Sequence, residues 1–348
     1  MSEKDYITML LEPHAVDLFP LPPYAQRAGN IYSMANYSSF TGPLLEALAP
    51  KTLCEIGSEL GGHTSFLADY CRRKQAKLLI CDPNPAEKPE LADVVEVHKK
   101  KSLDFLKNAP VLDVVFVDGD HHYEVVLKEL EALARIEREG GKRPFLFVHD
   151  VGWPCGRRDF YCDPSDVTAP HPHSFELGLS PFSVKALEGG ASAGGYYHKA
   201  LESGGSRNGI LTAVEDFVAA HPDWRFHTTF IVNGLAMLWR DEDLDDRQKA
   251  VLKDICEHLD WAAPLFAVLE LSRFMYEVEV GQERLRTKEL NNRLETAGQE
   301  WQRCQAYIKE LEERREYYRD FGRKREAYVK ELEQIITGFN RPLPPKEK

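Results

Sequence analysis

Two aspartates and two histidines crowd one short stretch of the chain, VFVDGDHHYE at residues 115–124. Asp118, Asp120, His121 and His122 stand within five consecutive positions. Carboxylates and imidazoles bind divalent cations, and imidazoles exchange protons near neutral pH. A solvated loop with Asp120 as the N-cap of the following helix would accommodate the same residues. Which chemistry applies depends on the elements that position this stretch.

Acidic and histidine side chains also follow other apolar runs. Glu55 lies near the end of KTLCEIG, Asp82 ends KLLICD, and His149 with Asp150 ends RPFLFVHD. The runs are almost continuously apolar, as in parallel strands that are buried on both faces. Parallel strands of such a sheet bring their ligand site to their carboxyl ends. We therefore expect these side chains and Asp118 to converge on one crevice.

Alternating strands and helices predict an α/β fold with a doubly wound, mostly parallel, seven-stranded sheet. A helix is predicted at residues 210–224, and Asn233-Gly234 between two apolar runs predicts a closing hairpin. The predicted strands are residues 51–57, 77–82, 93–99, 111–118, 143–150, 225–232 and 235–240.

A glycine loop, EIGSELGGHTS, follows the first predicted strand. Gly57 permits a tight turn, and Gly61 and Gly62 let the backbone approach a ligand before the helix begins. The spacing is not the G-x-G-x-x-G of nicotinamide-type loops. About twenty-five residues later, Asp82 stands where a carboxylate accepts hydrogen bonds from ribose hydroxyls.

With these motifs, roughly residues 35–240 resemble class I S-adenosylmethionine-dependent methyltransferases. The resemblance is greater to the bacterial branch of metal-dependent sugar and natural-product O-methyltransferases. It implies S-adenosyl-L-methionine as cofactor, with Asp82 on the ribose and Ser102 on the adenine side. A plain helix N-cap is an equal alternative for Ser102. The implied cofactor-binding residues are Glu55, Gly57, Gly61, Gly62, Asp82, Ser102 and Asp118.

The same resemblance implies a divalent metal, Mg²⁺, Mn²⁺ or another cation, held by Asp118, His149 and Asp150. The relatives have two adjacent acids where this chain has His149-Asp150. An imidazole shifts preference from Mg²⁺ toward Mn²⁺, Fe²⁺ or Zn²⁺; alternatively, His149 does not ligate. His121 matches the relatives' catalytic base. His122 competes for that role, because consecutive side chains of an extended segment face opposite ways.

The long polar segment after Asp150 is expected to be a lid or substrate-binding insertion, residues 151–208. Trp153 and Tyr161 would stack on sugar faces, while Arg157 and Arg158 would bind phosphate or carboxylate. The alternative is a folded insertion with an aromatic mini-core and surface arginines.

Composition excludes several classes of function. A net charge of -12 argues against nucleic-acid binding, which needs cationic side chains. The sequence shows no signal-like segment and no run of transmembrane length. Seven scattered cysteines fit reduced thiols, so we expect a cytoplasmic protein.

From residue 294 to residue 336, mostly apolar residues follow 3,4 spacing, which predicts a coiled-coil seam that is interrupted in the middle by Arg315, Gly322 and Arg325. AYIKELE at 306 and AYVKELE at 327 repeat at three heptads and support the register. We expect a homo-oligomer through residues 277–338, with a helix folded back on its own domain as the alternative. The remaining parts are an N-terminal arm (1–35), the methyltransferase domain (36–242), a helical connector (243–276) and a tail (339–348).

The expected function is a metal-assisted, S-adenosylmethionine-dependent O-methyltransferase that acts on a sugar hydroxyl, as in bacterial surface polysaccharide biosynthesis. One alternative is a catalytically inactive cofactor-binding protein that assembles through its coiled coil. Another is a methyltransferase of a small natural product.

Overall fold

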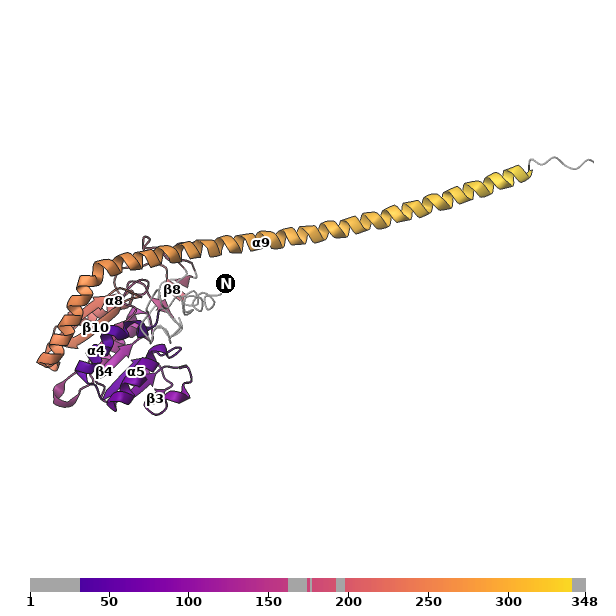
Figure 1. The fold of residues 1–348 in the computed structure, drawn as a ribbon. Coiled ribbons are helices and arrows are strands. Elements are labelled where there is room, and N and C mark those ends of the chain that lie inside the picture. Colours follow the sequence, from indigo (N-terminus) through magenta and orange to yellow (C-terminus); the bar gives the residue numbers. More distant parts are fainter. Residues whose placement is uncertain (1–31, 162–173, 176, 192–197, 340–348) are drawn as a thin grey trace, which may run out of the picture. The chain divides into compact units, whose positions relative to one another are not determined.

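The computed structural model describes residues 32–161, 174–175, 177–191 and 198–339. The chain divides into two compact units, Met1–Glu283 and Arg284–Lys348. The first unit contains the sheet and its covering helices (Figure 1). No helix among the described residues combines the length and the apolar character needed to cross a membrane.

Seven strands form the central sheet in the order β3-β2-β1-β4-β5-β10-β9. The first five are parallel, and β10 runs antiparallel to both β5 and β9. This confirms the predicted doubly wound, mostly parallel sheet. The strands are β1 (Thr52–Ile56), β2 (Lys77–Cys81), β3 (Val95–His98), β4 (Val114–Val117), β5 (Phe145–His149), β9 (Trp224–Thr229) and β10 (Leu235–Arg240).

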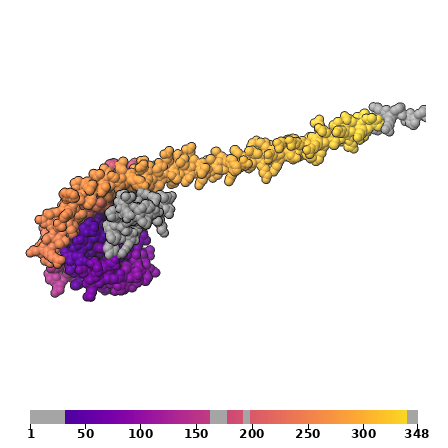
Figure 2. Space-filling model, in the orientation of Figure 1, coloured from indigo at the N-terminus to yellow at the C-terminus, as the bar shows by residue number. Residues whose placement is uncertain are grey.

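Both faces of the sheet are covered, which explains the continuous apolar runs. On one face, Cys54 and Val115 pack with α6 (Ser102–Leu106), α7 (Tyr123–Leu133) and α8 (Ile210–Ala220). On the other, Leu53 and Phe116 pack with α4 (Ser38–Leu48), α5 (Gly62–Lys74) and the start of α9 (Asp246–Phe339). Within the first unit, the orange start of α9 lies against the indigo α4 segment (Figure 2).

The hairpin between β9 and β10 turns through residues with positive φ, as Asn-Gly predicted. Asn233 and Gly234 have φ of 68° and 88°. The turn is clamped from two sides: the Tyr37 hydroxyl donates to the Val232 carbonyl (2.7 Å), and the Glu270 carboxylate accepts from the Val232 N–H (2.8 Å). Because Glu270 belongs to α9, the start of this helix is part of the sheet domain.

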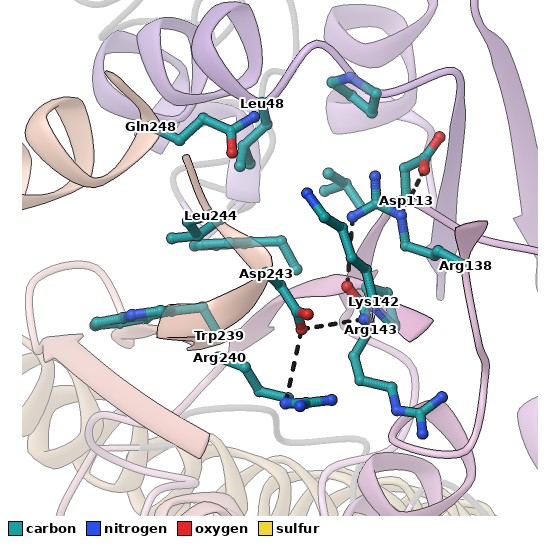
Figure 3. A pocket seen from close by; sticks show the side chains of 14 residues that line it. Leu48, Asp113, Arg138, Lys142, Arg143, Trp239, Arg240, Asp243, Leu244 and Gln248 are labelled. Carbon is teal, nitrogen blue, oxygen red and sulfur yellow. Dashed lines mark hydrogen bonds and ion pairs between the residues drawn. The ribbon is translucent and has the colours of Figure 1, made fainter. Parts of the chain in front are cut away.

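A smaller cavity lies at the amino ends of the parallel strands (Figure 3). There the Asp113 carboxylate accepts from the N–H groups of Lys51 (2.7 Å) and Thr52 (2.9 Å) and from Arg138 Nε (2.7 Å). Asp243 accepts from the Arg143 N–H at 3.0 Å. These carboxylates fasten loops to the sheet and neutralise the arginines around them.

The segment after β5 contains a small antiparallel sheet in the order β6-β8-β7: β6 (Phe160–Tyr161), β7 (Ser174–Phe175) and β8 (His198–Ala200). Next to it, Arg158 is 3% exposed and donates to the carbonyls of Leu201 (2.8 Å) and Val184 (2.7 Å). Residues 162–173, 176 and 192–197 of the predicted insertion lie outside the described residues.

The second unit is helical throughout its described part, residues 284–339, because α9 continues to Phe339. The predicted seam is exposed there: Leu294 is 71% and Trp301 64% accessible. A long helix is therefore confirmed, whereas the partner that would cover this seam stays a prediction.

Candidate active site

A cavity of about 1050 Å³ opens at the carboxyl ends of the parallel strands. Its walls come from the ends of β1, β2 and β5 and from the loops after β3 and β4. The convergence expected from strand ends is therefore present. Nine predicted site residues line it: Glu55, Gly57, Gly62, Asp82, Ser102, Asp118, His121, His149 and Asp150.

The glycine loop lies directly against the loop after β4. Gly57 has φ of 82°, and a methyl group on its Cα would collide with the Asp118 carbonyl oxygen. Only glycine lets the two loops approach this closely. Gly61, also at positive φ (68°), is the N-cap residue of α5 and is not among the lining residues.

Glu55 is 1% exposed, and its carboxylate is occupied by the first turn of α5. One oxygen lies 2.8 Å from His63 Nδ1, and the other accepts from the Thr64 hydroxyl at 2.6 Å. The sequence pattern indicated neither partner. They make Glu55 a tie between β1 and the helix that follows the glycine loop.

The Asp82 carboxylate holds the glycine loop in place. Its Oδ2 accepts from the N–H groups of Ser58 (2.8 Å) and Glu59 (3.1 Å), and its Oδ1 accepts from the Asn84 N–H (2.8 Å). The Ser58 hydroxyl also donates to Oδ2 (3.1 Å), so Oδ2 accepts three hydrogen bonds and Oδ1 accepts one. Because each carboxylate oxygen has about two lone-pair sites, the remaining acceptor capacity is on Oδ1. The role of Asp82 on a ribose stays a prediction.

Ser102 also lines the cavity but does not cap a helix. It is the first residue of α6, and Lys101 is the N-cap residue. The N-cap alternative for Ser102 is therefore wrong.

Asp118, His149 and Asp150 form a compact cluster in which each offers a ligand atom, all within 4.8 Å of one another. His149 Nδ1 lies 3.0 Å from Asp118 Oδ1 and 3.5 Å from Asp150 Oδ2. His121 Nε2 joins them at 2.6 Å from Asp150 Oδ2 and 3.9 Å from Asp118 Oδ1. The structure thus brings together the predicted metal ligands and the predicted base.

The cluster is strongly coupled by charge. Burial opposes a charged imidazole at His149, but the carboxylates of Asp118 and Asp150 outweigh it and raise the pKa of His149 to about 10. Burial likewise opposes ionisation of Asp150, yet His149 and His121 hold the pKa of Asp150 far below its usual range. The two opposite pKa shifts favour an imidazolium beside a carboxylate in this cluster.

The two consecutive histidines point in different directions, as an extended segment predicts. His122 is 2% exposed, lies 2.5 Å from Asp120 Oδ1 and packs edge-on against the Tyr161 ring. His122 itself is the N-cap residue of α7, so the expectation that Asp120 caps this helix is wrong. Only His121 of the pair lines the cavity.

The four residues predicted to bind substrate are held elsewhere. Arg157 forms a bidentate ion pair with Glu215, and the Tyr161 hydroxyl donates to Asp159. Trp153 packs on the Phe274 ring at 4.2 Å between centroids. Among the described residues, the cavity lining includes none of Trp153, Arg157, Arg158 and Tyr161.

Residues outside the parallel strand ends and the glycine loop also line the cavity: Tyr32, Pro154, Cys155, Phe160, Asn233 and Arg273. Arg273 comes from α9 and pairs with Glu270 (2.7 Å) and Glu277. No local pattern indicates such a residue, because it lies more than a hundred positions after the strand ends that it faces.

Comparison with known proteins gives one family match: residues 54–151 match the family described as a methyltransferase domain. No curated protein matches the chain. Similar solved structures include a Klebsiella pneumoniae protein described as an O-methyltransferase (17% identity, TM-score 0.37, covering 65% of this chain and 94% of that one). Another is a Bacillus cereus O-methyltransferase in complex with SAH (13% identity, TM-score 0.34, covering 68% of this chain and 90% of that one). A third is an SAH-bound Podospora anserina methyltransferase (12% identity, TM-score 0.35, covering 68% of this chain and 86% of that one).

Proposed function

We propose that this chain, a methyltransferase with its family match at residues 54–151, methylates a hydroxyl oxygen. The donor is S-adenosyl-L-methionine, and a divalent cation assists the transfer. The observation that carries the proposal is the cluster of Asp118, His121, His149 and Asp150 in the same cavity as the glycine loop and Asp82.

The donor set fits a divalent cation. At metal–ligand bonds of about 2.0–2.3 Å, neighbouring ligand atoms stand roughly 3 Å apart. The separations of 3.0 and 3.5 Å around His149 Nδ1 match that spacing. Asp118, His149 and Asp150 would hold the ion. When bound, the ion would orient the acceptor hydroxyl and lower its pKa. The imidazole favours Mn²⁺, Fe²⁺ or Zn²⁺ over Mg²⁺.

The remaining chemistry belongs to side chains of this chain. The acceptor oxygen attacks the methyl carbon in line with the carbon–sulfur bond, which breaks and leaves a neutral thioether. The hydroxyl proton goes to the His121 imidazole, whose Nε2 faces the cluster. To accept it, Nε2 must give up its contact with Asp150 Oδ2. The Asp150 carboxylate, 2.6 Å away, stabilises the imidazolium that forms. Asp82 and the glycine loop hold the donor so that the methyl group faces the cluster.

A sugar hydroxyl in a bacterial surface glycan is the acceptor that we propose. The cavity of about 1050 Å³ is at the upper end of small-molecule sites, which span about 300–1,000 Å³. It therefore has room for an acceptor beside the donor. The glycan assignment also draws on the pairing of a methyltransferase with a long exposed helix, which suits spacing along a polymer. A small natural product would need no such helix.

Calorimetry with S-adenosylmethionine and S-adenosylhomocysteine tests this function. We expect both to bind, and Asp82→Ala to weaken binding by about 1–3 kcal/mol, because a charged acceptor of ribose hydrogen bonds is lost. Asp113→Ala is the matched control, since it also removes a carboxylate that holds backbone N–H groups, at the other end of the sheet. If neither ligand gives heat of binding, the proposal that this chain is an enzyme is refuted. Binding without transfer to any hydroxyl acceptor would instead support an inactive assembly protein.

We also propose that the exposed seam of the second unit pairs with another copy of the chain. Ending the chain at Glu283 should leave a monomer that still binds cofactor, while the full chain is oligomeric by light scattering. Ile308→Lys in the seam should dissociate the oligomer, because it buries a charge in a coiled-coil core. Glu310→Lys, off the seam, is the control. A monomeric full chain at micromolar concentration would contradict self-association.

A further inference from the structure

Glu129, on α7, is 0% exposed, a rare position for a carboxyl group. Neither of its oxygens has a well-formed hydrogen bond to any residue that the structure describes. Buried polar atoms without partners are uncommon and call for a physical explanation. The carboxyl takes no part in the chemistry proposed above.

Glu129 lies directly behind the cavity wall. Val125, one turn earlier on the same face of α7, lines the cavity. Cys81, at the end of β2, and Ser102, at the start of α6, also line the cavity. Both interact electrostatically with Glu129. Ser102 therefore borders the cavity and also lies near the buried carboxyl.

The surroundings keep this carboxyl protonated at neutral pH. Burial is the largest effect and raises the pKa of Glu129 to about 8. Asp120 raises this pKa further, whereas the Ser102 hydroxyl and His121 lower it in part. Cys81 also interacts with Glu129, and burial raises the pKa of that thiol to about 12. A neutral carboxylic acid has an O–H donor, which an ionised carboxylate lacks.

We propose that neutral Glu129 is a positioning residue. Its carboxylic acid O–H donates a hydrogen bond to Ser102 Oγ and thereby directs the Ser102 hydroxyl hydrogen into the cavity, toward an acceptor nitrogen of the adenine ring. The proposal rests on the proposed function, because it requires the adenosine part of the donor. In a sheet of this kind the acid after β2 marks the ribose. The base then extends past Asp82 to the loop after β3, where Ser102 lies.

Protonation of Glu129 thus decides what Ser102 offers the ligand. An ionised carboxylate only accepts, so it draws the Ser102 hydrogen inward and leaves the adenine nitrogen facing an oxygen lone pair. Adenosine affinity should therefore be full below pH 8 and fall above it, by up to about tenfold per pH unit, as expected when binding requires one proton.

The test uses calorimetry of the full chain with 5′-methylthioadenosine, which has no titratable group between pH 6.5 and 9.5. We expect the wild-type Kd to rise at least tenfold from pH 7 to pH 9.5. Glu129→Gln, which still donates through its amide, should bind as the wild type does at pH 7 and keep that affinity at pH 9.5. Ser102→Ala should bind more weakly at pH 7 and show no pH dependence.

Glu131→Gln is the matched control on the same helix: Glu131 pairs with His221 near the surface. This variant should keep the wild-type pH profile. An identical pH profile in wild type and Glu129→Gln, or a flat wild-type profile, would overturn the role of Glu129 while leaving the methyltransferase proposal intact. No binding of 5′-methylthioadenosine or S-adenosylhomocysteine at any pH would instead overturn the proposed function. If Glu129→Gln does not fold, Ser102→Ala decides: a wild-type pH profile in that variant refutes the relay.

Discussion

Asp118→Asn and Asp150→Asn should each strip the purified protein of its divalent cation and abolish methyl transfer. Each substitution replaces an anionic oxygen of the cluster by a neutral amide, and a cation needs that charge. Loss of outer partners of metal ligands already costs about 10–100-fold in metal affinity or activity, so loss of a ligand should exceed 100-fold. Cofactor affinity should stay nearly unchanged, because the proposed cation would contact the acceptor rather than the cofactor.

The two asparagines are also conservative for the fold. Asp150 has φ of 59°, a conformation that asparagine tolerates better than most residues. Metal content by mass spectrometry and cofactor affinity by calorimetry need no acceptor, while transfer of a labelled methyl group is measured on the sugar that an acceptor screen identifies. Asp120→Asn is the control, since Asp120 contacts His122 outside the cluster; it should keep the metal. Transfer that survives both chelation and Asp118→Asn would rule out metal assistance.

His121→Ala should keep the cation but slow methyl transfer by about 10²–10⁴-fold, the usual contribution of a positioned base. Three ligand side chains remain in that variant, whereas the hydroxyl proton loses its acceptor. Metal content and transfer rate measured on the same preparation separate the two effects. If His121→Ala loses the metal, the 2.6 Å contact with Asp150 reports a fourth ligand rather than a base.

His122→Ala should behave differently, because His122 is buried between Asp120 and Tyr161. Removal of a packed, hydrogen-bonded side chain should lower the melting temperature while the transfer rate changes much less. Thermal unfolding and methyl transfer of both variants make the comparison direct. A larger rate loss in His122→Ala than in His121→Ala would exchange the roles of the two histidines.

Much of the sheet and the place of the site were determined by the sequence alone. Apolar runs such as 77–82 and 143–150 record burial on both sheet faces, a property that each strand carries in its own residues. Strand ends then locate the crevice, because parallel strands all end at the same edge. For these reasons Asp82, Asp118, His121 and Asp150 were found at the cavity. The expected methyltransferase agrees with the family match at residues 54–151.

Only the tertiary structure decided what each of these side chains touches. Arg157 and Arg158 looked available for an anion, but Glu215 and the carbonyls of Val184 and Leu201 already hold them. Arg273 enters the cavity from a helix far along the chain. Local periodicity reports whether a residue faces inward. It does not report which distant residue it meets, because that choice depends on how loops and helices pack in three dimensions.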